Sequence, residues 1–310
     1  MQQAELPQPG LGQACENAGQ EWWAAMADGE FPRAWAASDR VLQRRRPEQR
    51  DDPAQPYHLR WLWDGTPLDG SDVLVRCYHG LGDTLQFARY LPALRQRAAR
   101  VTLEVQPELI PLMRLIGGPN DIVPFDPASP SPPSRCDVEI MELAHALRLV
   151  PEPTPYLLLP RTRGATGPRV GFCWQAQAGW RPERSISTSA ASRLVACVDL
   201  PLQSLQKGMA LRGMAACPDA LLDTAAAIAG LDLVITVDTM VAHLAGAIGV
   251  PIWLLLDTTP DWRWLAGGRG SPWYRGVRKY RQARPGNWTD PLRSVAADLT
   301  HLGQAGTVEV

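Results

Sequence analysis

The sequence LDLVITVDTMVAHLAGAIGVPIWLLL, residues 231 to 256, decides the fold class of this chain. Residues 231–237 and 250–256 are nearly unbroken apolar runs rich in Val, Ile and Leu, as in parallel strands that are covered on both faces. Residues 240–248 between them repeat apolar side chains at helical spacing, which predicts a helix packed on the sheet. The passage therefore predicts a strand, a helix and a second strand in one parallel sheet.

The same alternation extends toward the N-terminus, so the chain is long enough for two α/β halves. In the second half we expect a strand at 169–174, a helix at 187–198, a strand at 202–205 and a helix at 220–229. In the first half we expect a strand at 73–77, a helix at 83–99 and strands at 101–105, 122–125 and 138–141.

Residues 20–45 read as two short helices that form a hairpin resembling one tetratricopeptide unit. We find no second copy of it, and a polar, proline-punctuated linker follows at 46–56. A Pro/Arg/Gly stretch at 151–168 is the expected hinge between the two halves. The predicted domains are a helical hairpin and linker at 1–56, an acceptor domain at 57–160 and a donor domain at 161–310.

Composition gives no reason to expect nucleic acid as a partner, because the formal net charge of 310 residues is only -1. We find neither a signal peptide nor an apolar run of the roughly 20 residues that span a bilayer. The scattered cysteines suit a reducing compartment, and we expect a cytoplasmic protein without a membrane span. These cysteines are Cys15, Cys77, Cys136, Cys173, Cys197 and Cys217.

Ligands of open α/β sheets bind beyond the carboxyl ends of strands, so the turn after residues 73–77 is a candidate site. Gly80 and Gly82 would let a ligand approach the backbone there, although a purely structural turn would also explain them. Asp83 can be the N-cap of the following helix or a general base, and His79 is the competing base.

The turn after residues 235–237 is the second candidate site. Asp238 and Thr239 stand at a helix start, where free N–H groups and the helix dipole suit a phosphate. An aspartate would repel a phosphate, so we expect Thr239 to face the phosphate while Asp238 caps the helix or bonds sugar hydroxyls. His243 lies one turn later and would by itself be an ordinary core or surface histidine.

The strings GLGDTLQFARYLP (80–92) and VDTMVAHLAGAIG (237–249) resemble glycosyltransferase family nine, which includes the ADP-heptose heptosyltransferases. The resemblance covers about residues 62 to 288 and is closest to the branch that is often fused to tetratricopeptide repeats. It implies two Rossmann-like halves that face a cleft, known as a GT-B fold, with the N-terminal hairpin as a remnant of the fused repeats. It also implies transfer of a sugar from a nucleotide-diphosphate donor to a glycan, lipid or protein acceptor.

The resemblance also assigns roles to single residues. Asp83 matches the general base, and the residues from Asp238 to His243 match the motif that holds the sugar and diphosphate of the donor. Arg181 or Arg184 would neutralise the leaving diphosphate. Ser204 and Gln206 would border the donor base and ribose. With no Asp-x-Asp sequence, an arginine and a helix dipole would replace a metal, and no cofactor is expected.

Two departures from the family pattern stand in the sequence. Tyr78 and His79 occupy places that usually read Glu-Gln, which implies a different contact on the acceptor side. The loop WQAQAGWRPERS (174–185) differs from the expected asparagine-rich, basic version. Two rival functions stay open: a catalytically silent nucleotide- or sugar-binding assembly module, and an enzyme that epimerises or hydrolyses a sugar nucleotide.

Overall fold

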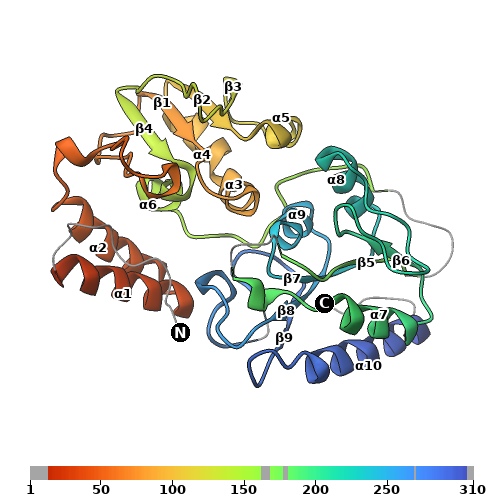
Figure 1. Cartoon of the computed structure of the whole chain (residues 1–310). Helices are drawn as coiled ribbons and strands as arrows, with labels where there is room; N and C mark the ends of the chain where they lie inside the picture. The colour runs from red at the N-terminus through yellow and green to blue at the C-terminus, as the bar shows by residue number, and fades with distance from the viewer. Residues whose placement is uncertain (1–12, 162–167, 177–180, 269, 306–310) are drawn as a thin grey trace. The chain divides into compact units, whose positions relative to one another are not determined.

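The structure is a computed structural model that describes residues 13–161, 168–176, 181–268 and 270–305. The chain forms two compact units (Figure 1). The first unit contains Met1–Pro151 and the short segment Asp261–Gly267, and the second contains Glu152–Pro260 and Gly268–Val310. The boundary expected from the sequence lies at 160/161, whereas the structure divides the chain after Pro151 and returns residues 261–267 to the first unit.

The first unit is built on a four-stranded parallel sheet in the order β3-β2-β1-β4. Its strands are β1 (Asp72–Arg76), β2 (Arg100–Val105), β3 (Asp121–Pro124) and β4 (Cys136–Glu139). Its helices are α1 (Gln13–Asp28), α2 (Phe31–Leu42), α3 (Leu81–Phe87), α4 (Leu91–Arg97), α5 (Ile110–Ile116) and α6 (Leu143–Leu147). The helices α1 and α2 pack against each other as an antiparallel pair (Figure 1).

The expected helix at 83–99 is two helices, α3 and α4, joined by a 3₁₀ turn at Ala88–Tyr90. Pro92 is the second residue of α4 and has no N–H to donate to the carbonyl of Ala88, which interrupts a continuous helix. The helix also begins at Leu81, two residues before its predicted start.

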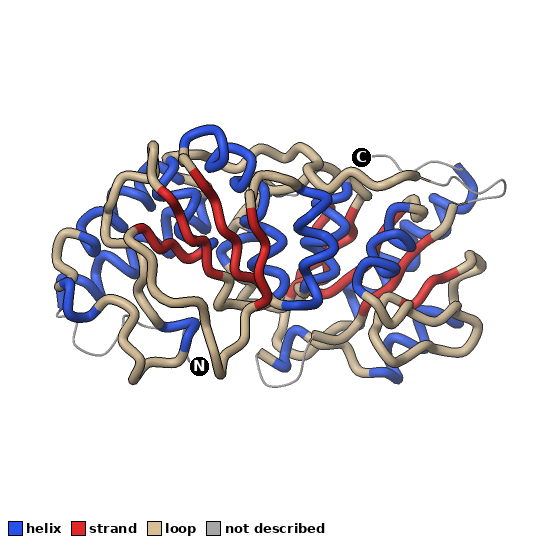
Figure 2. The backbone as a smooth tube through the Cα atoms, turned by 90° about the horizontal axis from the view of Figure 1, so that it is seen from above, coloured by secondary structure: helices blue, strands red, loops and turns tan. Residues whose placement is uncertain are grey.

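The second unit is built on a five-stranded parallel sheet in the order β6-β5-β7-β8-β9. Its strands are β5 (Val170–Cys173), β6 (Leu202–Ser204), β7 (Leu233–Val237), β8 (Ile252–Leu256) and β9 (Val277–Arg281). Its helices are α7 (Thr188–Ala196), α8 (Leu221–Ala229), α9 (Met240–Ile248) and α10 (Thr289–Ala305). The strands of each sheet run side by side between helices in Figure 2. The predicted α/β class with parallel strands is confirmed.

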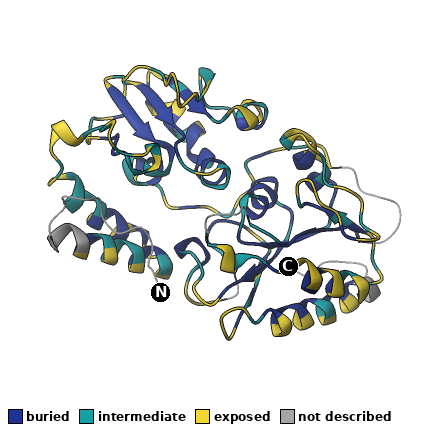
Figure 3. Cartoon of the chain, in the orientation of Figure 1, coloured by how far each residue is buried: buried dark blue, intermediate teal, exposed yellow. Residues whose placement is uncertain are grey.

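Helices cover both faces of the second sheet, and this explains why β7 and β8 have no polar face. One face packs on apolar side chains of α7 and α10, while α8 and α9 lie on the other (Figure 1). All residues of β7, β8 and the last eight of α9 are buried (Figure 3). The 3₁₀ turns outside the helices are Pro47–Gln49, Tyr57–Leu59, Pro107–Leu109, Ile140–Glu142, Pro182–Arg184 and Trp262–Trp264.

Each sheet has one point where the strand order reverses, and such a point is where open α/β sheets bind ligands. In the first unit, β1 leads to β2 and β3 on one side and to β4 on the other, so the reversal lies between β1 and β4. In the second unit it lies between β5 and β7. Both predicted turns directly follow strands of these pairs.

The five described cysteine side chains are free thiols, and Cys15 lies outside the described side chains. Among the described helices, none is long and apolar enough to cross a bilayer.

Candidate functional site

Asp83 lies in the first turn of α3, directly beyond the carboxyl end of β1. It is not the N-cap, because Gly80 holds that place; instead the Asp83 Oδ2 atom reaches back and accepts the Gly80 N–H at 3.0 Å. Its Oδ1 atom accepts from Arg263 Nη2 at 2.6 Å. The Asp83 side chain keeps 25% of its surface exposed, so its remaining lone pairs can still meet a ligand. Gly82 lies within α3.

His79 lies at the reversal between β1 and β4, where its Nδ1 is 3.1 Å from Oε1 of Glu139, the last residue of β4. Burial is the largest single influence on the pKa of His79 and lowers it, as does the charge of Arg263. The charge of Glu139, its hydrogen bond and the charge of Asp83 together outweigh these effects and raise the pKa to about 9. His79 is therefore protonated at neutral pH.

Arg184 lies across the reversal in the second unit. Its Nη1 is 3.4 Å from Oδ2 of Asp238, which directly follows β7, while Arg184 itself belongs to the loop after β5. The Asp238 side chain is only 7% exposed, and Arg184 is 16% exposed. A buried carboxylate needs such a partner, because an uncompensated charge away from water is costly.

Arg181 makes a different pair, with Asp257 at the carboxyl end of β8. Its Nη2 is 2.8 Å from Asp257 Oδ2, and it also donates to the carbonyl oxygen and the hydroxyl of Thr259. The backbone of Arg181 has a φ of 47°, in the left-handed region, so the ordered contacts of its side chain hold a strained turn in place. Residues 177–180, in the same loop, lie outside the described residues.

Thr239 occupies the N-cap position of α9, but its side chain accepts no capping hydrogen bond from the helix. His243 is buried in α9, and its Nδ1 is 2.9 Å from the hydroxyl of Tyr274. From the sequence we expected both Thr239 and His243 to bind the donor. Thr239 lies just beyond the end of β7, whereas His243 is buried within the second unit against Tyr274.

Ser204 and Gln206 lie at and just beyond the end of β6, next to β5. The Ser204 hydroxyl donates to the carbonyl of Met209 at 2.5 Å, and Gln206 Oε1 accepts the Gln175 N–H at 2.9 Å. These two side chains hold the loops that follow β5 and β6. Their predicted place beside a nucleotide base stays a prediction.

Sequence reasoning missed four residues of these clusters: Glu139, Asp257, Arg263 and Tyr274. Asp257 could have been found, because an acidic residue directly after an apolar strand has the same pattern as Asp238. Arg263 could not, because its partner Asp83 lies 180 residues earlier.

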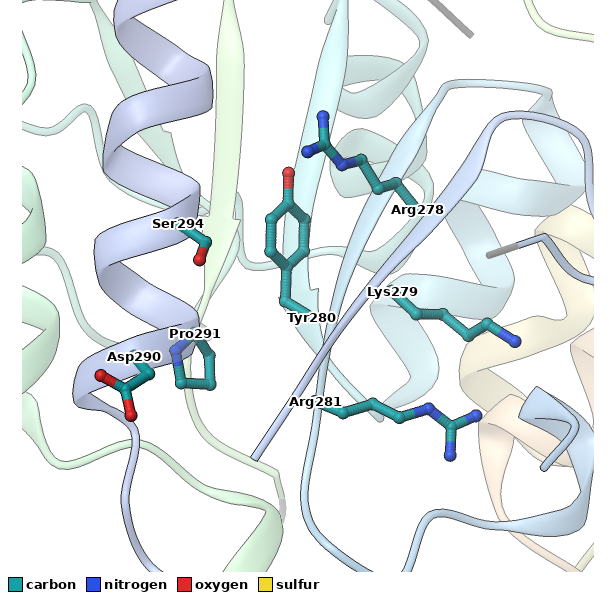
Figure 4. Close-up of a pocket in the computed structure, with 7 residues that line it drawn as sticks. All are labelled: Arg278, Lys279, Tyr280, Arg281, Asp290, Pro291 and Ser294. Carbon is teal, nitrogen blue, oxygen red and sulfur yellow. The ribbon is translucent and has the colours of Figure 1, made fainter. Parts of the chain in front are cut away.

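A pocket of about 270 Å³ lies elsewhere in the second unit, between β9 and the start of α10 (Figure 4). It is lined by Arg278, Lys279, Tyr280, Arg281, Asp290, Pro291 and Ser294. Tyr280 donates to Asp298 of α10 at 2.8 Å, and Arg278 also pairs with Asp298. These contacts tie α10 to the edge strand, so we give the pocket a structural role. Among the described residues, no group of His, Cys, Asp and Glu is arranged to hold a metal ion.

Several solved structures share this fold, and two of them are described here. One is the Escherichia coli ADP-heptose lipopolysaccharide heptosyltransferase II, with a TM-score of 0.57 and 13% sequence identity over 76% of this chain and 99% of that chain. The other is a family 9 glycosyl transferase from Veillonella parvula DSM 2008, with a TM-score of 0.57 and 11% identity over 77% and 98%. No protein-family model matches the chain, and no curated protein matches it. The fold is therefore that of these glycosyltransferases.

Proposed function

We propose that the chain is a glycosyltransferase that moves a sugar from a nucleoside-diphosphate sugar to an acceptor hydroxyl. The acceptor oxygen forms a bond to the anomeric carbon, the bond from that carbon to the phosphate oxygen breaks, and the nucleoside diphosphate leaves with the electron pair. The hydroxyl proton goes to a base of the protein. The observation that carries the proposal is that the polar residues of both units gather at the strand-order reversals of a glycosyltransferase fold.

Asp83 is the proposed base. Its carboxylate is partly exposed and lies at a strand end of the first unit. The pKa of about 9 supports this choice over His79, because a protonated imidazolium cannot accept a proton at neutral pH. His79 instead supplies a positive charge beside Glu139, where an acceptor can be contacted.

Arg184 is the proposed partner of the leaving diphosphate, with Thr239 and the first N–H groups of α9 beside it. The long 3.4 Å contact to Asp238 and the place of Arg184 at the reversal support this choice. Arg181 makes a shorter contact, to buried Asp257, and also donates to the carbonyl and the hydroxyl of Thr259. Because these acceptors already engage its guanidinium, we assign Arg181 a structural role.

The finer assignments are part of the same proposal. The donor is a nucleoside-diphosphate sugar, with an ADP-linked heptose as the first candidate because one structural relative is described as an ADP-heptose enzyme. The acceptor is a glycan, a lipid or a protein. We also propose that the enzyme works without a metal in the cytoplasm, and that α1 and α2 are a remnant of fused tetratricopeptide repeats.

The test is a thermal-shift and calorimetric screen with ADP-, GDP-, UDP- and dTDP-sugars. A donor that binds the native state raises the melting temperature by mass action. Arg184→Ala should weaken binding of that donor about ten- to a hundredfold, the usual loss for a charge-assisted phosphate contact. Arg293→Ala is the matched control, because that side chain on α10 is 73% exposed.

Three outcomes separate the alternatives. Stabilisation by one donor, together with transfer of its sugar to an acceptor and release of the nucleoside diphosphate, supports the transferase. Binding without turnover in the presence of glycan, lipid and peptide acceptors would instead favour the silent assembly module. If no nucleotide sugar shifts the melting temperature, the proposed function is wrong.

A further inference from the structure

We propose that Arg263 is a positioning residue that orients the carboxylate of Asp83 for proton transfer, and that residues 261–267 are a strap that carries it there. This role rests on the proposed transferase function and deepens it. The strap belongs to the first unit, whereas the chain directly before and after it belongs to the second. These seven residues therefore pack with a different unit from that of their neighbours in the chain.

The strap is fixed to the first unit by contacts with α1. Trp262 meets Trp22 edge-on, with ring centroids 5.3 Å apart, and the Ala266 N–H donates to the carbonyl of Ala27 at 2.9 Å. Leu265 has a φ of 52°, a strained value for a leucine, and its side chain lies close to Gly29. These contacts hold the strap against α1, and the Arg263 side chain has separate contacts of its own.

The guanidinium of Arg263 is fixed from several directions. Its Nη1 and Nε donate at 2.8 Å to Asp261 Oδ1 and to Gln86 Oε1, and it lies over the Trp262 ring at 4.2 Å. Asp261 also accepts the Arg263 N–H at 3.0 Å, which closes the turn on itself. Because the guanidinium is planar and its Nη1 and Nε are held by these contacts, the direction of its Nη2 N–H is fixed as well. The Nη2 N–H points at Asp83 Oδ1.

Asp83 is consequently oriented through both oxygens, since Gly80 N–H binds Oδ2 and Arg263 binds Oδ1. Proton transfer requires that the base stand within hydrogen-bond reach of the acceptor hydroxyl. A displacement of about 1 Å can cost a factor of about a hundred. Arg263 does not need to touch either substrate to affect turnover, because it fixes the direction of the Asp83 carboxylate.

A purely structural strap is the competing explanation, and Trp22 offers the matched control. Trp22→Leu removes a strap contact without touching Arg263 or Asp83, so it should lower the melting temperature and leave turnover near normal. Arg263→Met should lower kcat about ten- to a hundredfold and leave donor affinity, measured by calorimetry, within about twofold. Arg263→Lys keeps the charge but not the fork, and should recover only part of the loss.

A double variant gives a readout that a structural role would not move. In an Asp83→Asn background, Arg263→Met should cause no further loss, since its effect acts through Asp83.

The results that would overturn this role are distinct from those that would overturn the function. A normal kcat in Arg263→Met would remove the positioning role alone. The positioning role would also be removed if Arg263→Met lowered kcat further in the Asp83→Asn background, or if Trp22→Leu lowered kcat as much as Arg263→Met does. Absence of transfer by the unsubstituted chain would remove the proposed function, and the role of Arg263 with it.

Discussion

Two histidines of the first unit show that a carboxylate neighbour alone does not fix a protonation state. His79 lies 3.1 Å from Glu139, and His145 lies 2.8 Å from Asp39. Burial lowers the pKa of both, yet the pKa of His79 is raised to about 9 and that of His145 is lowered. Two carboxylates, Glu139 and Asp83, raise the pKa of His79, whereas His145 has only Asp39, which Arg148 shares at 2.6 Å.

We therefore expect the His79 ring to titrate with a pKa of about 9, and that of His145 below the ordinary value, in one NMR experiment on labelled histidines. Glu139→Gln should lower the pKa of His79, because the largest contribution that opposes burial is then removed. Because the pKa of His79 is higher in the folded than in the unfolded state, protonation of His79 stabilises the protein at low pH. This stabilisation is lost as the pH rises through about 9. Stability should thus fall more between pH 7 and 10 in the unsubstituted chain than in His79→Gln. Equal titration of both rings would contradict this account.

At the scale of elements, α9 shows how a helix is fixed against its neighbours by one glycine. A Cβ atom at Gly246 would lie 2.2 Å from the ring of Tyr274. The hydroxyl of Tyr274 lies 2.9 Å from Nδ1 of His243, one turn earlier in α9. Atoms of rigid groups do not tolerate such a distance, so the helix or the ring would have to move. The close approach of α9 to this ring thus depends on the missing Cβ.

Gly246→Ala should consequently destabilise the protein by about 1 to 3 kcal/mol, the usual cost of overpacking a core. Gly19→Ala in α1 is the control, because nothing lies within 4 Å of its added Cβ. There, the better helix propensity of alanine should stabilise by about 0.5 to 1 kcal/mol. Chemical unfolding of both variants measures the difference. A Gly246→Ala protein as stable as the unsubstituted chain would show that α9 can shift freely.

The elements that were predicted correctly are those whose sequence pattern is local. The apolar runs around α9 predicted β7 and β8, and the predicted bounds of α9 agree with the structure. β9 was missed, because VRKYR is an edge strand with only two fully buried residues and carries charges in between. The ion pair of Asp83 with Arg263 was out of reach for another reason: it depends on a chain reversal over 180 residues, which no spacing rule encodes.

At the scale of the whole molecule, the chain passes from one unit to the other after Pro151, Pro260 and Gly267. Acidic and basic residues are nearly equal in number, 32 and 31, so the net charge supplies no general attraction for a diphosphate. The positive charge has to be local, and at the reversal of the second sheet it belongs to Arg184. Asp238 partly neutralises the charge of Arg184, so we expect the N–H groups at the start of α9 to contribute to offsetting the charge of a diphosphate.

The same local charges determine whether donor binding should depend on a metal ion. A divalent cation would be needed if the local charges could not offset a diphosphate; Arg184, Thr239 and the α9 N–H groups are the groups we propose for that task. We expect the donor dissociation constant from calorimetry to change less than about twofold between excess EDTA and millimolar magnesium or manganese. In Arg184→Ala, magnesium should recover part of the lost affinity, because a cation can then fill the vacated place beside Asp238. A donor that binds the unsubstituted chain only in the presence of a divalent metal would contradict this prediction.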